Sequence, residues 1–191
     1  AACISLYIVV MWIEFSPAFL VKWGLHDARR KLDRMMFFFI ALGTVLPMMH
    51  QSSLGSLLVV MGTQIHPLWQ SIVLPLIFLI SAIVMGYAVV LFESCVAAAG
   101  YRRSIEMHLL TPLSKIMLGL LGVFLVVRFG DILIRGALGR AFEPSLQALM
   151  FWVETVCFVL PFALLGSEGK RRNPANLFLA GVALMLGGVL L

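Results

Sequence analysis

Six long apolar stretches, separated by short connections, limit what this chain can fold into. A helix of about 20 apolar residues crosses the ~30 Å hydrocarbon layer of a bilayer. The predicted spans are roughly 2–23, 35–61, 71–98, 114–136, 146–166 and 175–191. Only 12% of the residues are charged, compared with about 25% in soluble domains. The sequence therefore predicts an all-α membrane protein, a polytopic transmembrane helix bundle with about six spans, in which residues 1–191 form a single bundle.

The basic residues are distributed unevenly among the connections between these spans. The loops rich in Lys and Arg are those near 25–34, 100–113 and 167–174. The connection at 62–70 has no Lys or Arg, and the fourth has only Arg135 and Arg140. By the positive-inside rule, the three basic loops are expected to face the cytoplasm. Because these clusters account for most of the positive charge, we expect contact with membrane lipid and no binding of nucleic acid.

A polar segment interrupts the second predicted span. Pro47 is followed by His50, Gln51, Ser52 and Ser53 within an otherwise apolar stretch. In a bilayer, such groups are tolerated only where they face protein, water or a ligand. We expect the helix to be broken here and its polar side chains to line an interior site.

Five ionisable residues lie inside predicted spans: Glu14, Glu93, Arg128, Asp131 and Glu154. Each costs about 2.5–3.5 kcal/mol on insertion scales, so a partner and a function are expected. Arg128 and Asp131 are three residues apart on one helical face, which allows a mutual salt bridge. With Glu154 and His50 they could converge on a polar cavity in the outer half of the bilayer. The alternative is a set of ion pairs that only fix helix packing.

Glu14 and Glu93 lie on the predicted cytoplasmic side of that cavity. A carboxyl group in a low-dielectric environment can hold and pass a proton near neutral pH. These two residues are therefore candidates for a proton path from the cytoplasm. For Glu93, which is near the membrane surface, the alternative is a side chain that simply reaches the surface.

Neither haem nor metal is expected in this chain. A membrane b-type haem needs axial ligands such as histidines on facing helices at similar depth. Only His50 lies in a predicted span, whereas His26, His66 and His108 lie in connections. The three cysteines have no metal-ligand spacing. His50 could be an ordinary interior histidine, but its polar neighbours favour a quinone, whose two-electron reduction is coupled to two protons.

An ordered series of motifs resembles the polysulfide-reductase/NrfD family of membrane subunits, and within it the HybB-type subunits of periplasmic nickel-iron hydrogenases. The matching segments are 14–17, 46–56, 66–71, 85–87, 92–93, 127–131 and 151–154. The resemblance spans nearly the whole chain. Members of this family have about eight to ten spans, so we expect the chain to be the central part of a longer protein.

The resemblance implies a haem-free, quinone-reactive subunit of a bacterial or archaeal cytoplasmic membrane. Such a subunit would exchange electrons between menaquinone or ubiquinone and a periplasmic iron-sulfur protein, which connects it to a catalytic subunit. The same reaction could be coupled to proton translocation. Matched position by position, the quinone-pocket candidates are His50, Gln51, Ser52, Arg128, Asp131 and Glu154. Glu14 and Glu93 match acids that could relay protons.

A different class of protein is also compatible with buried acids and an interrupted helix. Proton- or ion-coupled transporters share both features. The sequence shows no clear inverted repeats, which makes this alternative the weaker one.

Overall fold

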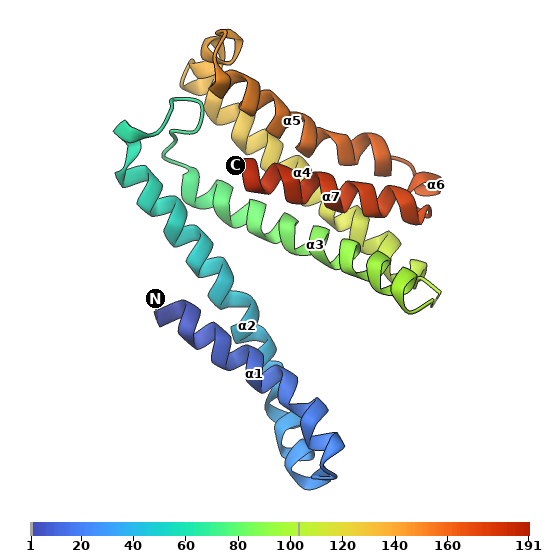
Figure 1. The fold of residues 1–191 in the computed structure, drawn as a ribbon. Coiled ribbons are helices and arrows are strands. Elements are labelled where there is room, and N and C mark those ends of the chain that lie inside the picture. The colour runs from blue at the N-terminus through green and yellow to red at the C-terminus, as the bar shows by residue number, and fades with distance from the viewer. Residues whose placement is uncertain (1, 103) are drawn as a thin grey trace. The chain divides into compact units, whose positions relative to one another are not determined.

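The computed structural model describes residues 2–102 and 104–191, and in this part of the chain it contains helices, turns and no strand. The chain divides into two compact units, residues 2–54 and Gly55–Leu191, with the boundary inside the second helix. The elements of each unit can be followed by colour in Figure 1. Each unit is described by itself.

The first unit is a pair of helices joined by a tight turn. Helix α1 (Ala2–Lys22) is followed by α2 (His26–Val60), which begins in this unit and continues into the second. Gly24 in the turn has a φ of 71°, a left-handed conformation that glycine adopts without strain. Val10 is 1% exposed, so this face of α1 is closely covered.

The second unit contains four long helices and three short helical segments. After η1 (Gly62–Gln64) come α3 (Leu74–Gly100), α4 (Met107–Ile134), η2 (Ala137–Phe142), α5 (Leu146–Leu165), α6 (Glu168–Arg171) and α7 (Pro174–Leu190). Helix α7 packs against α3 and α5, and α3 packs against α4 (Figure 1). The main core lies between these helices and includes Met117, Leu121, Phe124, Phe158 and Leu184, all with at most 1% exposure.

Two glycines allow α7 to approach its neighbours closely. A Cβ atom at Gly181 would lie 3.0 Å from the backbone oxygen of Ala88 on α3. A Cβ atom at Gly187 would lie 3.1 Å from the Cβ of Cys157 on α5. Small residues at such contacts bring membrane helices near enough for extensive van der Waals packing.

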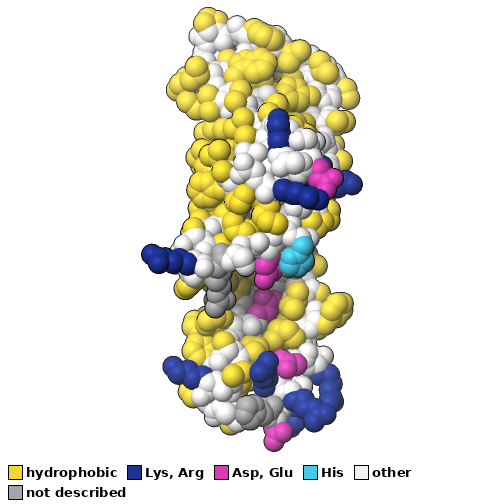
Figure 2. All heavy atoms as spheres, turned by 90° about the vertical axis from the view of Figure 1, so that its right-hand side faces the viewer, with side chains coloured by type: hydrophobic (Ala, Val, Ile, Leu, Met, Phe, Trp, Pro, Cys, Tyr) yellow, Lys and Arg dark blue, Asp and Glu magenta, His cyan; other side chains and the backbone are white. Residues whose placement is uncertain are grey.

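The helices and their apolar surfaces confirm a polytopic, all-α membrane protein. Among the described residues, five helices are long and apolar enough to cross a membrane, and α7 is a sixth, shorter apolar helix. Large apolar side chains such as Phe37 and Val126 are exposed, at 84% and 74%. Figure 2 shows hydrophobic side chains over much of the visible face, with the basic ones gathered in a few places.

The structure differs from the predicted spans at two helix starts and at one proline. Helix α2 begins at His26 and α4 at Met107, so both extend through much of the predicted basic loops. The predicted break after Pro47 is wrong, because α2 continues through it. A proline removes only one backbone hydrogen bond, and a helix can accommodate that loss with a bend. That residues 1–191 form one bundle stays a prediction.

Candidate functional site

The last turns of α4 carry three charged side chains on one helical face. Arg128, Asp131 and Arg135 are separated by three and four residues, a spacing that aligns side chains along a helix. Together with Glu154 on α5 and Trp69 from the connection before α3, they form what we call the arginine-carboxylate cluster. All five residues belong to the second unit.

Arg128 and Glu154 form a buried ion pair between α4 and α5. The Arg128 Nη2 atom donates a 2.9 Å hydrogen bond to Oε2 of Glu154 and lies 2.7 Å from Oε1. The exposed fractions of the two residues are 4% and 0%. The 2.7 Å contact brings the charges together without hydrogen-bond geometry, so Oε1 accepts no directed hydrogen bond among the described residues. Oε1 therefore retains the capacity to accept a donor.

The Trp69 indole completes the surroundings of this ion pair. Its Nε1 donates a 3.0 Å hydrogen bond to Oε2 of Glu154. The Phe151 ring packs edge-to-face against Trp69 and lies 5.7 Å from the guanidinium carbon of Arg128. Phe151 also belongs to a small apolar core with Leu68, which holds the connection before α3 in place. The sequence around Trp69 thus positions a hydrogen-bond donor against a buried carboxylate.

Asp131 has a different partner from the one predicted. Its Oδ2 accepts a 2.8 Å hydrogen bond from Arg135 Nε and lies 2.7 Å from Arg135 Nη2. The Nη1 atom of Arg135 donates to the backbone oxygen of Pro67 at 2.8 Å. The predicted Arg128–Asp131 salt bridge is therefore wrong. Arg128 pairs instead with Glu154 on α5, and Asp131 pairs with Arg135, one turn further along α4.

A hollow of about 490 Å³ lies beside the Asp131–Arg135 pair. Its lining combines polar and apolar side chains from the connection before α3 and the end of α4, namely Val59, Pro67, Gln70, Ser71, Ile72, Arg135, Gly136, Ala137 and Arg140. Arg140 is exposed, whereas Ser71 is buried at 6% exposure. The hollow brings two guanidinium groups to a surface next to the buried cluster.

The cluster combines hydrogen-bond donors and acceptors in an environment that excludes water. In such a low-dielectric site, polar groups interact more strongly than in water, and an unpaired charge is costly. Guanidinium and indole N–H groups can donate to a carbonyl oxygen, while a carboxylate can accept a hydroxyl proton. These are the functional groups that a ligand alternating between a carbonyl and a hydroxyl form would need.

The other predicted pocket residues lie in the first unit. His50, Gln51 and Ser52 are on α2, and each is half-buried. The structure brings Arg128 and Glu154 together, with Asp131 on the same face of α4 as Arg128. Convergence of His50, Gln51 and Ser52 with that group stays a prediction.

The two predicted proton-relay acids have contrasting surroundings. Oε1 of Glu14 is buried and has no hydrogen-bond partner among the described residues. It lies so close to Gly43 of α2 that a Cβ atom there would be 2.5 Å away. Glu93 is exposed on α3, as expected if its side chain reaches the membrane surface. A relay role for either acid stays a prediction.

Trp69 and Arg135 are cluster members that the residue-by-residue reasoning did not assign to the site. Arg135 continues the helical face of Arg128 and Asp131 towards the predicted outer surface, and its spacing from Asp131 allows an i, i+4 pair. Trp69 lies within the 66–71 motif, but composition alone gives no reason to pair its indole with an acid 85 residues away. That motif was the available signal.

Comparison with known proteins identifies the family. The family model for polysulphide reductase, NrfD, matches residues 8–191. The chain belongs to the NrfD family. This confirms the resemblance found in the ordered sequence motifs.

Two curated relatives of this NrfD-family chain are longer than the chain itself. The probable Ni/Fe-hydrogenase 2 b-type cytochrome subunit of Escherichia coli (strain K12) is 40% identical over 190 residues, which cover 98% of this chain and 48% of that protein. A protein of Nitratidesulfovibrio vulgaris is 38% identical over 108 residues, covering 56% of this chain and 28% of that protein. The chain thus spans about half or less of these relatives. No solved structure matches it.

The name of the E. coli relative raises the question of whether this chain could ligate a b-type haem. In the second unit, His66 precedes α3 and His108 begins α4, so the ~40 Å length of α3 lies between the segments that carry them. His66 Nδ1 also accepts a 3.4 Å hydrogen bond from the Leu68 backbone. In the first unit, His50 is on α2, and the His26 side chain lies outside the described part. Within each unit taken by itself, the described residues place no two histidines on facing helices, as a haem with two histidine ligands would require.

Proposed function

We propose that the chain forms part of a haem-free, quinone-reactive membrane subunit. This subunit would pass electrons between a periplasmic iron-sulfur protein of a nickel-iron hydrogenase and the quinone pool. Membership of the NrfD family and the name of the hydrogenase relative support this class of function. The single observation that carries the proposal is the buried Arg128–Glu154 ion pair, to which the half-buried Trp69 adds a hydrogen bond.

The proposed chemistry follows from the groups in the cluster. Reduction of a quinone to a quinol takes up two electrons and two protons, and the electrons would come from the iron-sulfur partner. Arg128 and His50 would donate hydrogen bonds to the quinone oxygens, with Gln51 and Ser52 lining the pocket. Glu154 and Asp131 would set the local charge and exchange protons with those oxygens. Menaquinone and ubiquinone both fit this chemistry.

Protons for the quinone would pass through the carboxyl groups of Glu14 and Glu93. Glu14 is the stronger candidate, because its buried Oε1 has no hydrogen-bond partner among the described residues. Glu93 would exchange protons nearer the surface that the basic loops predict to be cytoplasmic.

One of the two observations that favoured a transporter is contradicted by the structure. It relied partly on an interrupted helix at the polar segment of the second span. Helix α2 runs through that segment without interruption. Electron transfer to or from quinone is therefore the function that we propose.

The experiment compares quinone-linked and dye-linked electron transfer in the full-length complex. We expect His50→Ala and Asp131→Asn to abolish quinone-linked flow while the catalytic partner still reduces an artificial dye. Trp69→Phe should lower the quinone-linked rate about 10-fold or more, because it removes one hydrogen bond to a buried carboxylate. Trp152→Phe is the matched control, since its indole donates instead to the backbone oxygen of Ala141 at 2.8 Å. Full quinone-linked activity in the first three variants would refute the proposal.

A further inference from the structure

A hollow at the end of the second unit that carries α6 is lined by Arg172, the last of three consecutive cationic residues. The hollow has a volume of about 540 Å³ and is lined by Met107, His108, Thr111, Pro112 and Arg172. Three cationic residues occupy positions 170–172, and Glu168 is the one carboxylate in α6. This end lies far along α4 from the arginine-carboxylate cluster, so its charges are not explained by that cluster.

The three cations differ in how they are already used. Lys170 donates from Nζ to the backbone oxygen of Ala163 at 2.9 Å, and Arg172 donates from Nη2 to Glu168 at 2.8 Å. The Nε atom of Arg171, in contrast, is buried and has no hydrogen-bond acceptor among the described residues. A buried donor without an acceptor is costly, so the Arg171 guanidinium would be stabilised by an additional anionic partner.

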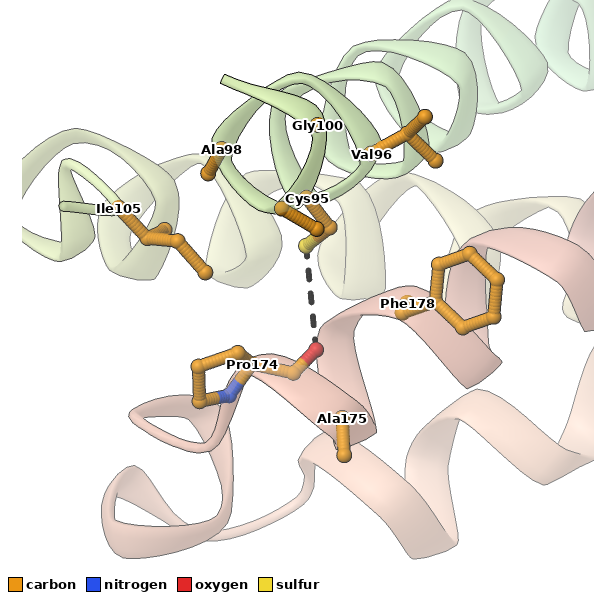
Figure 3. A pocket seen from close by; sticks show the side chains of 9 residues that line it. Cys95, Val96, Ala98, Gly100, Ile105, Pro174, Ala175 and Phe178 are labelled. Carbon is orange, nitrogen blue, oxygen red and sulfur yellow. Dashed lines mark hydrogen bonds between the residues drawn. The ribbon is translucent and has the colours of Figure 1, made fainter. Parts of the chain in front are cut away.

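An apolar groove of about 720 Å³ adjoins the cationic hollow along the chain. It lies between the end of α3 and the start of α7, and its lining includes Cys95, Val96, Ala98, Ile105, Pro174 and Phe178 (Figure 3). Ile105 in the groove is two residues from Met107 in the hollow, and Pro174 in the groove is two residues from Arg172 in the hollow. The groove and the hollow are therefore partly lined by neighbouring residues of the sequence. One hydrogen bond crosses the groove wall, from Cys95 Sγ to the Pro174 oxygen at 3.8 Å.

We propose that this paired feature binds an anionic phospholipid, with its phosphate at Arg171, Arg172 and His108 and an acyl chain in the groove beside Ala98 and Phe178. Arg172 and His108 in the lining can donate hydrogen bonds to a phosphate, and basic pockets between membrane helices bind anionic headgroups. The apolar groove favours a phospholipid over free phosphate, because only the phospholipid has an acyl chain that could occupy the groove. The site is independent of the proposed quinone chemistry.

The test uses the full-length subunit in its complex, reconstituted into nanodiscs of phosphatidylcholine with a titrated fraction of phosphatidylglycerol. Native mass spectrometry after release from the nanodiscs counts the phosphatidylglycerol that stays bound. We expect Arg171→Gln and Arg172→Gln each to weaken retention about 5-fold. Ala98→Phe, which fills the groove without changing any charge, should also weaken it. Arg34→Gln, in the basic part of α2, is the charge-matched control and should retain lipid normally.

Three outcomes would overturn the lipid site. One is equal loss in Arg34→Gln, which would indicate a general attraction to basic surfaces. Another is displacement of the lipid by millimolar inorganic phosphate with no effect of Ala98→Phe, which would indicate a phosphate site. The third is retention of phosphatidylglycerol by both arginine variants at the level of the unmodified protein. Equal unfolding temperatures in pure phosphatidylcholine establish that the variants are folded.

Discussion

Glu154 is fully buried, and Arg128 and Trp69 supply the charge and the hydrogen bond that hold its carboxylate. Burial of two opposite charges costs desolvation energy that their attraction only partly offsets. Such a pair is therefore weak evidence for stability and better evidence for a role that needs charged groups inside the membrane. The free acceptor capacity of Oε1 is consistent with that role.

A double-mutant cycle separates the structural and functional contributions of this pair. Arg128→Met or Glu154→Leu alone should destabilise the protein by about 3–5 kcal/mol, because each leaves one buried charge uncompensated. The double variant should recover most of the stability yet lack quinone-linked activity. Thermal unfolding of the full-length protein, together with quinone-linked electron transfer, measures both. Single variants that unfold at the unmodified temperature would contradict the buried pairing.

At the scale of elements, hydropathy predicted the positions of the membrane helices because the bilayer imposes one length and one polarity on each. Side-chain pairing was harder to predict. Arg128 had an acid three residues away on its own helix and another on a different helix, and only packing of α4 against α5 decides between them. The hydrogen bond from Trp69 to Glu154 also depends on tertiary packing, because the two residues are 85 positions apart in the sequence.

Contact between α1 and α2 gives a prediction at this scale. Gly43→Ala should displace the Glu14 carboxyl group and slow proton uptake coupled to quinone turnover, because its Cβ would lie 2.5 Å from Glu14 Oε1. Gly86→Ala on α3 is the matched control, since a Cβ there meets nothing within 4 Å. That control should be neutral or stabilise the helix by about 0.5–1 kcal/mol. Equal proton uptake in liposomes for both variants would argue against a relay role for Glu14.

At the scale of the whole molecule, the orientation in the membrane rests on the alternation of basic connections. Helices α2 and α4 begin inside two of these basic regions, but this does not change which regions carry the Lys and Arg residues. The three basic regions should therefore face the cytoplasm, and the connection that contains Glu143 should face the periplasm.

Cysteine labelling tests this orientation. In a full-length background without native cysteines, Glu143→Cys should react with an impermeant maleimide in spheroplasts with intact inner membranes. Glu168→Cys should react only after the membrane is opened. Both residues are exposed, so access from the aqueous side is comparable. The reverse labelling pattern would invert the proposed entry side for electrons.

The central claim is that this chain binds a quinone, with His50 and members of the arginine-carboxylate cluster among its proposed ligands. Photolabelling of the complex with an azido-quinone, followed by peptide mapping, tests it most directly. The account predicts label in the segments that contain His50 and Arg128 or Glu154, and loss of label when native quinone competes. Displaceable label confined to other parts of a complex that still reduces quinone would contradict it.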